Sequence, residues 1–238
     1  MKNAIIVGAS SGIGKELARC LAENGYGVGL AARRMNLLKE LSCELSSPVW
    51  TKSVDLTDPQ QAMSQLRELI AEMGDVELFV ISAGTGFLNS DLNWEYERDT
   101  IAVNVSGFCA AVNVAISYLK TRKSGHLVGI SSVAALRGDS VAPAYSASKA
   151  FVSNYLDGVR QMVHKRQLPI VVTDVQPGFV DTAMAKGDGQ FWVAAPRKAA
   201  QQIFDAIRKR RKHVYVTKRW RIIAWFLRFA PDWLYYRL

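Results

Sequence analysis

Short apolar runs rich in β-branched residues alternate with longer segments of helical periodicity, and this alternation constrains the fold more than any other feature of the chain. The apolar runs cover Ala4–Val7, Gly27–Ala32, Val49–Val54, Glu77–Ile81, His126–Ser131, Pro169–Val175 and His213–Thr217. Helical patterns separate them, over about Ile13–Asn24, up to about Leu45, and over Pro59–Met73, Trp94–Arg122, Ala144–His164 and Pro196–Lys209. Strands joined through helices pair in parallel, because each crossover returns the chain to the same end of the sheet. The sequence therefore predicts an α/β fold, a doubly wound parallel sheet of about seven strands.

Nothing resembling a linker, a repeat or a low-complexity segment divides the 238 residues. We therefore expect a single domain over residues 1–217, followed by an amphipathic helical extension over 218–238. With 49% hydrophobic residues, the chain has too large an apolar share for a disordered or collagen-like protein. In doubly wound sheets ligands bind beyond the carboxyl ends of the strands, so the loops that follow the strands are the places to seek function.

The cysteines and histidines give no sign of a metal centre or of disulfide bonds. Cys20, Cys43 and Cys109 are odd in number and lack a Cys-x-x-Cys spacing, which is typical of reduced thiols in a cytoplasm. The three histidines are equally scattered along the chain. Only Ala4–Val7 is continuously apolar before the first glycine, so we expect no export signal and a cytoplasmic protein.

A glycine-rich turn, Gly8-Ala9-Ser10-Ser11-Gly12-Ile13-Gly14, joins the first predicted strand to the first helix. Glycine lets the backbone turn sharply and approach a ligand closely, while the free N–H groups and the helix dipole favour a pyrophosphate. The turn fails the Walker pattern, because Glu16 follows Lys15, and this excludes a kinase-like loop. We expect this turn to bind a dinucleotide.

Arg33 and Arg34 lie at the end of the second predicted strand, about 20 residues past this turn. In a dinucleotide fold the residue at this place contacts the adenosine ribose. An acidic residue at that place binds a 2′-hydroxyl, whereas a guanidinium group pairs with a 2′-phosphate. The sequence therefore favours NADP(H) over NAD(H). The alternative is that both arginines are merely solvated at a strand end.

Tyr145 and Lys149 stand four residues apart at the start of a predicted helix, which places the ammonium beside the phenol. Ser132 follows the preceding strand and reaches the same edge of the sheet. A ketone that accepts a hydride needs a positioned proton donor, and a phenol with its ordinary pKa of about 10 suits neutral pH poorly. We expect Tyr145 to be that donor, with Lys149 lowering the pKa of its phenol.

These features resemble the short-chain dehydrogenase/reductase family, and the resemblance runs from Lys2 to about Thr217. The motifs that carry it are Gly8-x-x-x-Gly12-x-Gly14, Asp55-Leu56, Ala83-Gly84, Asn104-x-x-Gly107, Ser131-Ser132, Tyr145-x-x-x-Lys149 and Pro177-Gly178-x-x-x-Thr182, in the family's order and spacing. The resemblance implies a Rossmann fold, an NADPH-dependent oxidoreductase that interconverts a carbonyl and a secondary alcohol, and assembly into a homo-oligomer.

The resemblance also implies a role for each matched residue. Asn104, Ser132, Tyr145 and Lys149 correspond to the catalytic tetrad, in which Lys149 also holds the nicotinamide ribose and Asn104 anchors a proton-relay water. Asp55 corresponds to the adenine contact, and Thr182 to the contact with the nicotinamide carboxamide. The remaining cofactor contacts are expected at Gly8, Ser10, Ser11, Gly12, Ile13, Gly14, Leu56, Ala83, Gly84, Pro177, Gly178 and Val180.

Two positions depart from the family pattern. Val7 stands where the family usually has Thr, and Ile81-Ser82 stands where it usually has two asparagines. Both places usually support the sheet ends or the cofactor site, so the departures bear on loop stability and cofactor affinity.

The basic charge is concentrated at the end of the chain. Ten of the 30 Lys and Arg residues lie in 208–238, with Asp232 as the one acidic residue there, and the rest of the chain is neutral. On a helix, Ile222, Ile223, Phe226, Leu227, Ala230 and Leu234 form an arc opposite Arg221, Arg228 and Asp232. Such a segment suits an anionic membrane surface or packing over the cleft or a second subunit, and both remain open. Its continuous apolar run is too short to span a bilayer. The neutral charge of the rest of the chain argues against a nucleic-acid partner.

The substrate site is expected to draw on Ser132 and Tyr145 and on largely apolar side chains, namely Phe87, Met184, Phe191 and Trp192. A hydrophobic or lipid-like carbonyl or alcohol is therefore the expected substrate, with a small soluble carbonyl compound as the alternative. A rival interpretation is a non-enzymatic NADP-binding scaffold or sensor, but Tyr145 and Lys149 are both present.

Overall fold

The computed structural model describes residues 2–183 and 191–237 and contains one seven-stranded sheet in the order β3-β2-β1-β4-β5-β6-β7. The strands are β1 (Lys2–Val7), β2 (Tyr26–Ala32), β3 (Val49–Ser53), β4 (Leu78–Ile81), β5 (Gly125–Ile130), β6 (Ile170–Pro177) and β7 (His213–Val216). Every neighbouring pair is parallel. The predicted doubly wound sheet is confirmed, and each predicted strand lies within two residues of an observed one.

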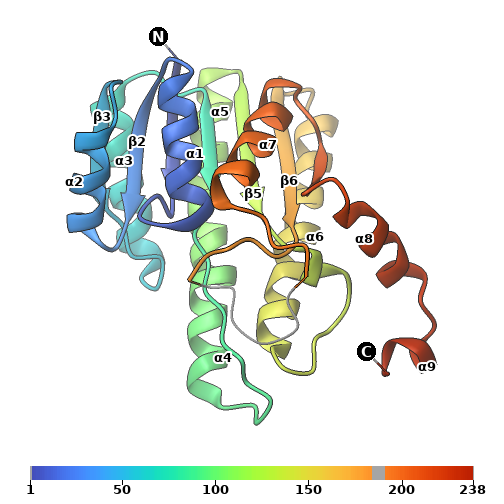
Figure 1. Ribbon diagram of the computed structural model, residues 1–238. Helices are drawn as coiled ribbons and strands as arrows, with labels where there is room; N and C mark the ends of the chain where they lie inside the picture. The colour runs from blue at the N-terminus through green and yellow to red at the C-terminus, as the bar shows by residue number, and fades with distance from the viewer. Residues whose placement is uncertain (1, 184–190, 238) are drawn as a thin grey trace.

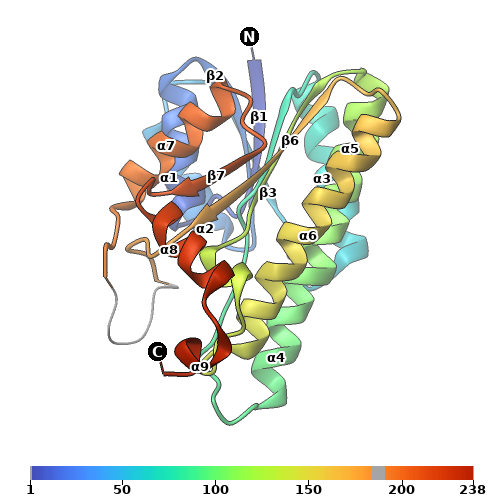
Figure 2. The same ribbon diagram turned by 90° about the vertical axis from the view of Figure 1, so that its right-hand side faces the viewer.

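Helices cover both faces of the sheet (Figure 1). The helices α1 (Gly12–Glu23), α2 (Met35–Glu44) and α7 (Pro196–Arg208) pack on one face. The helices α3 (Pro59–Met73), α5 (Phe108–Arg122) and α6 (Pro143–Lys165) pack on the other. The view along the sheet shows the two layers on either side of the strands, with α8 (Trp220–Phe229) and α9 (Asp232–Tyr235) below β7 (Figure 2).

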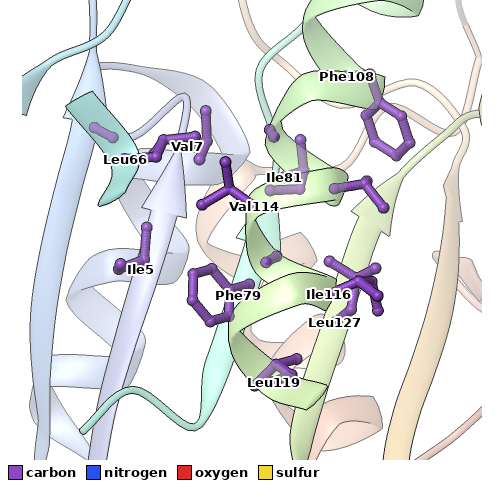
Figure 3. Packing of buried hydrophobic residues seen from close by; sticks show 14 of the residues in the cluster. Ile5, Val7, Leu66, Phe79, Ile81, Phe108, Val114, Ile116, Leu119 and Leu127 are labelled. Atoms are coloured by element: carbon purple, nitrogen blue, oxygen red, sulfur yellow. The ribbon is translucent and has the colours of Figure 1, made fainter. Parts of the chain in front are cut away.

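The two apolar cores follow the period of two in the strands. In β1, Ile5 and Val7 join the core on the side of α3, α5 and α6, whereas Ala4 and Ile6 join the opposite core. Figure 3 shows the first core, where Phe79 and Ile81 of β4 and Leu127 of β5 lie against side chains of α5. Because helices cover both faces, the strands read as continuous apolar runs, as the sequence indicated.

The helical run Trp94–Arg122 is interrupted in a way that the sequence pattern did not reveal. It consists of α4 (Trp94–Ile101), a π-helical segment η1 (Ala102–Gly107) and α5. At Gly107 an added Cβ would lie 2.4 Å from the Leu56 carbonyl oxygen, so the run passes against the loop after β3 at van der Waals distance. Within the described residues this run is long and apolar enough to cross a membrane by composition, but 56% of its apolar window is buried in the core.

Parallel pairing brings the carboxyl ends of β1 to β6 to one edge of the sheet. The strand order reverses beside β1, which pairs with β2 on one side and β4 on the other. This is the topological switch point at which such sheets bind ligands. The glycine-rich turn after β1 lies there.

The opposite edge of the sheet holds a buried histidine. The Nε2 atom of His126 lies 2.7 Å from Thr173 Oγ1, which donates its single proton to the Arg211 carbonyl at 2.5 Å. The imidazole therefore donates at Nε2. Burial lowers the pKa of His126 from 6.5 to about 4, because the charged form loses its hydration.

This depressed pKa predicts an acid-sensitive fold. The folded state resists a proton that the unfolded state accepts, so the free energy of unfolding falls as the pH drops from about 6.5 towards about 4. The loss is on the order of 3 kcal/mol. Urea unfolding at a series of pH values measures it in the wild type and in His126→Asn, with His164→Asn on the exposed face of α6 as control. A His126→Asn protein as acid-sensitive as the wild type would contradict this assignment.

Candidate active site

The glycine-rich turn is held by close backbone packing. Gly8 has φ +92°, and an added Cβ would lie 2.5 Å from the Ala83 nitrogen. At Gly14 an added Cβ would lie 2.2 Å from the Gly8 carbonyl oxygen, so the turn folds tightly onto the start of α1. Ser10 and Ser11 lie in the turn, and Ile13 lies in the first turn of α1. The dipole of α1 favours an anion at this end of the helix.

The two arginines after β2 lie beside this turn. Both are exposed, and Arg34 donates to Ser10 Oγ and Ser11 Oγ at 2.9 Å each. Two guanidinium groups and the helix N-terminus thus make this corner strongly attractive to phosphate. The side chains predicted to read the ribose and those predicted to hold the pyrophosphate are in direct contact.

The loops after β3 and β4 close the same corner. Asp55 Oδ1 accepts from the Thr57 amide at 2.9 Å and from Thr57 Oγ1 at 2.8 Å, and Leu56 is buried. The amides of Ser82 and Ala83 both donate to the Val7 carbonyl at 2.8 Å. Val7 and Ile81 are themselves core residues. In this chain backbone hydrogen bonds and apolar packing therefore join the two strand ends at the positions that depart from the family pattern.

Tyr145 and Lys149 lie against the backbone of the loop after β4, and the Ser132 hydroxyl adjoins the Tyr145 phenol. An added Cβ at Gly86 would lie 2.5 Å from Tyr145 Cδ2, and one at Gly84 would lie 3.1 Å from Lys149 Nζ. The ammonium donates to the Ile130 carbonyl at 3.1 Å and lies 5.7 Å from the centroid of the Tyr145 ring. Ser132 Oγ caps the 3₁₀ helix η2 (Val133–Leu136) and donates to the Pro177 carbonyl at 3.4 Å.

Burial controls the protonation of this group. It raises the pKa of the Tyr145 phenol, and a hydrogen bond with the Ser132 hydroxyl opposes the rise. Burial also lowers the pKa of Lys149 to about 8. The expected lowering of the phenol's pKa by Lys149 is not seen in this geometry, in which burial raises that pKa and the ammonium donates its hydrogen bond to the Ile130 carbonyl. A protonated phenol beside a hydroxyl can donate a proton to a substrate oxygen.

Asn104 lies in the π-helical segment and is 2% exposed. Its Oδ1 accepts from the Thr85 amide at 2.8 Å, and its Nδ2 donates to the Thr85 carbonyl at 2.7 Å and to Ser148 Oγ at 2.9 Å. The asparagine therefore clamps the loop after β4 to α6. An added Cβ at Gly84 would lie 3.3 Å from Asn104 Oδ1, so the fourth residue of the predicted tetrad joins the other three.

A buried carboxylate behind these residues was missed by the sequence reasoning. Asp174 on β6 is 2% exposed and accepts from Ser131 Oγ, from Ser153 Oγ at 2.6 Å and from Gln176 Nε2 at 3.2 Å. Ser131 precedes Ser132, and Ser153 lies one turn after Lys149. Asp174 thereby ties the strand that presents Ser132 to the helix that presents Lys149. Its signal in the sequence is a charged residue inside a strand that otherwise lacks charge.

The loop after β6 brings the last predicted cofactor residues to the site. Pro177 ends β6, Gly178 donates to the Val216 carbonyl at 2.6 Å, and Val180 is buried. Thr182 lies over the glycine-rich turn, since its Cγ2 would be 3.1 Å from a Cβ at Gly12. Of the predicted substrate residues, Met184 lies outside the described residues.

The other predicted substrate side chains fall into two groups. Phe87 stacks on Tyr96 with ring centroids 4.7 Å apart. Phe191 stacks on Trp220 at 5.1 Å, and Phe179 and Trp192 meet the same indole edge-on at 5.4 and 6.2 Å. These four side chains, Phe179, Phe191, Trp192 and Trp220, form an aromatic cluster beside the site. Trp220 comes from the C-terminal extension. Periodicity predicted a helix there but not its contact with this cluster.

The C-terminal extension packs on the site at two places. The Trp220 ring covers Gly178, where an added Cβ would lie 2.0 Å from the indole. Farther along, Arg137 donates to the Ala230 carbonyl at 2.6 Å and to Asp232 at 3.2 Å, and lies over the Tyr235 ring. The side of α8 that carries Trp220 and Ala224 therefore packs on the rest of the chain. Packing over the cleft was one of the two alternatives that the sequence left open.

The predicted apolar arc is right in part. Ile223, Phe226 and Leu227 are half-buried and Ala230 is buried, but Ile222 is 67% exposed and lies with Arg221 and Arg228 around one surface hollow, instead of opposite them. The arc left out Trp220 and Ala224, which are buried at one turn's spacing. In addition, β7 separates the basic residues 208–212 from α8, so the basic segment 208–238 is not one surface.

The comparisons agree with this architecture. A family model described as short chain dehydrogenase matches residues 2–191. An uncharacterized oxidoreductase of Myxococcus xanthus is 38% identical over 188 residues, which cover 77% of this chain and 74% of that protein. The structure of a short chain dehydrogenase/reductase from Burkholderia phymatum in complex with NAD has a TM-score of 0.84 at 20% identity, covering 94% of this chain and 92% of that chain. A short-chain dehydrogenase from Sphingobium yanoikuyae in complex with NADPH has a TM-score of 0.79 at 21% identity, with the same coverage.

The Asp174 contacts predict a specific effect on Lys149. The negative charge of Asp174 raises the pKa of the lysine against the larger effect of burial. Asp174→Asn therefore moves the pKa of Lys149 further below about 8, whereas Ser153→Ala, which keeps the charge and removes one hydrogen bond, moves it less. Carbon NMR of labelled lysine side chains across a pH titration measures both. Equal pKa values in Asp174→Asn and the wild type would show that the carboxylate does not act on Lys149.

Proposed function

The chain belongs to the short-chain dehydrogenase/reductase family, and from this premise we propose that it is an NADPH-dependent oxidoreductase that interconverts a carbonyl and a secondary alcohol. The observation that carries the proposal is that Tyr145 and Lys149 lie against the loop after β4, beside the glycine-rich turn, with the Ser132 hydroxyl at the phenol. A non-enzymatic scaffold would not need a buried lysine next to a half-buried phenol, since each costs desolvation.

The proposed reduction uses these side chains in separate roles. When bound, the nicotinamide cofactor supplies a hydride, which goes to the carbonyl carbon. Tyr145 gives its phenolic proton to the carbonyl oxygen, so that an alcohol and a tyrosinate result, and Ser132 donates a hydrogen bond to the same oxygen. Lys149 binds the ribose and stabilises the tyrosinate as an ammonium, and Asn104 holds the loop and helix that frame the proton path. The reverse sequence oxidises the alcohol.

The cofactor proposal rests on the contact between the two arginines and the turn. Arg34 lies on Ser10 and Ser11, and Arg33 is exposed next to it, so a 2′-phosphate would meet two cations beside the pyrophosphate site. The two similar solved structures hold NAD and NADPH, so the choice between them rests on this chain's own residues.

The substrate proposal rests on the aromatic cluster. Phe191 and Trp192 keep 45% and 40% of their surface exposed, although both rings also pack on Trp220. A hydrophobic or lipid-like carbonyl would cover this apolar surface, and each aromatic ring buries a large area. A small soluble carbonyl compound is the alternative, and it would leave the cluster open to water.

We also propose that the protein acts in the cytoplasm as a homo-oligomer and can lie peripherally on an anionic membrane. The support for the last statement is the exposed cations of the C-terminal extension, Lys218, Arg221 and Arg228, together with Trp225 and Trp233, which are 65% and 64% exposed. No nucleic-acid partner is proposed, because the charge excess is confined to residues 208–238.

Removing the two guanidinium groups tests the choice of cofactor. In Arg33→Ala/Arg34→Ala we expect NADPH affinity to fall about tenfold to a hundredfold, because charge-assisted hydrogen bonds to the 2′-phosphate are lost, with NADH affinity little changed. Fluorescence titration of both cofactors measures this. Lys39→Ala, which removes an exposed cation of α2, is the matched control. A wild type that binds both cofactors equally would refute the preference.

Removing the phenolic hydroxyl tests the proton donor. We expect Tyr145→Phe to lower turnover roughly a hundredfold to ten-thousandfold, with NADPH affinity nearly unchanged, because the ring still packs on Gly86. NADPH absorbance with a panel of ketones and alcohols follows the reaction. Tyr155→Phe, on the same helix, is the control and should retain full turnover. Turnover in Tyr145→Phe within a few-fold of the wild type would assign the proton to another residue.

A further inference from the structure

The outer face of the C-terminal helices carries an apolar stripe framed by cations. Ile222, Trp225 and Phe229 follow one another at intervals of three and four residues on α8 and are 67%, 65% and 68% exposed. Lys218, Arg221 and Arg228 lie beside them, and together with Tyr215 these residues line a surface hollow of about 640 Å³. Beyond Pro231, Trp233 and Tyr236 are also exposed, at 64% and 79%. We call the surface formed by the exposed side chains of residues 215–229 the outer face.

We propose that the outer face docks on an anionic lipid bilayer and that the docked enzyme takes its carbonyl substrate from that bilayer. The first part names the surface that would make the membrane contact proposed above, and the second part rests on the proposed enzymatic function. Exposed indole and phenyl rings enter the boundary between headgroups and acyl chains, and arginine and lysine beside them pair with lipid phosphate. The charge of the surface matches this occupant, because residues 218–237 hold five basic residues and one acidic residue, Asp232, which faces Arg137 of the body.

The inner face of the same helix is part of the proposed substrate site. Trp220 covers Gly178, and the carbonyl of the adjacent Pro177 accepts from the Ser132 hydroxyl at 3.4 Å. At the other end of the extension, Ala230 and Asp232 bind Arg137. Arg137 follows η2, the single helical turn that Ser132 caps. The extension therefore contacts two segments that adjoin Ser132, the loop after β6 at Gly178 and the residue Arg137 after η2.

These contacts place the bilayer near the aromatic cluster. An α-helix with its side chains is about 10 to 12 Å across, so the outer face and the Trp220 side of α8 are separated by about one helix diameter. A carbonyl compound dissolved among the acyl chains would then leave the bilayer beside Phe191 and Trp192, whose rings are partly exposed. This arrangement favours substrates that partition into lipid over those that diffuse to the site through water.

The fold also supplies a control surface. The basic residues 208–212 lie at the opposite end of β7 from α8, and Lys209 and Lys212 are exposed there. Replacing both with glutamine changes the net charge as much as replacing Arg221 and Arg228. Only the second change lies on the outer face.

Flotation with lipid vesicles tests the docking. The full-length protein is mixed with phosphatidylcholine vesicles or with vesicles that also contain phosphatidylglycerol, at low and at high salt. We expect binding to the anionic vesicles that is partly lost in salt, and about a tenfold loss in Trp225→Ser/Phe229→Ser and in Arg221→Gln/Arg228→Gln. Lys209→Gln/Lys212→Gln should bind nearly as well as the wild type. Equal loss in all three variants, or equal binding to both lipids, would overturn the docking proposal.

Turnover in the presence of vesicles tests the delivery of substrate. A short, water-soluble ketone and its long-chain homologue are compared with NADPH, with and without anionic vesicles. We expect vesicles to raise turnover of the long-chain ketone about severalfold in the wild type but not in Trp225→Ser/Phe229→Ser, while both proteins reduce the short ketone equally. Docking without any such rise would overturn the delivery step. If neither ketone nor any other carbonyl is reduced by the wild type, the proposed function fails while the flotation result stands.

The mass of the protein in solution separates lipid from a second copy of the chain. Light scattering of the wild type and of Trp225→Ser/Phe229→Ser should give the same oligomeric state. A wild-type oligomer that dissociates in this variant would show that a second subunit covers the outer face, and would overturn the proposal.

Discussion

The close packing of backbone against backbone at the carboxyl edge of the sheet is the constraint on which the rest of the site depends. Parallel pairing brings the carboxyl ends of all seven strands to one edge, but the loops can approach one another only where side chains are absent. Gly8 meets the Ala83 backbone, Gly14 meets the Gly8 carbonyl, and Gly107 meets the Leu56 carbonyl, each at a distance that a Cβ would violate. A methyl group at any of these places would push apart two backbone segments that hold functional side chains.

This packing also sets the electrostatics of the site. Drawing Tyr145 and Lys149 under the loop after β4 removes them from water, and desolvation then moves both pKa values towards the neutral forms. Two interactions oppose it, the Ser132 hydroxyl at the phenol and the Asp174 charge at the ammonium. Because Asp174 is held by Ser131 and Ser153, the group that keeps Lys149 charged also fixes the distance between β5 and α6. In the proposed reaction, a dinucleotide's phosphate charge would favour the same ammonium form.

The sequence predicted the sheet and the placement of the site because both depend on local patterns. Apolar runs with helical segments between them define the strands, and the glycine-rich turn, Arg34, Tyr145 and Lys149 each follow a strand or begin a helix. What it could not predict depends on contacts between distant segments. Asp174 acquires its partners only when β6 lies beside β5 and α6, and the lowering of the Tyr145 pKa by Lys149 was expected from spacing alone, which does not report burial. The π-helical segment reflects a contact between Gly107 and Leu56, about 50 residues apart, which periodicity cannot reveal.

The C-terminal extension shows the same limit most clearly. Its periodicity predicts an amphipathic helix with one apolar arc, which leaves packing and membrane contact open as alternatives. The described structure gives α8 two apolar faces, one formed by Trp220 and Ala224 against the body and one formed by Trp225 and Phe229 towards solvent. An exposed aromatic pair on a helix already anchored by Gly178 and Arg137 serves no further packing of this chain. Packing on one side therefore does not compete with docking on the other; it holds the second face at a fixed orientation beside the site.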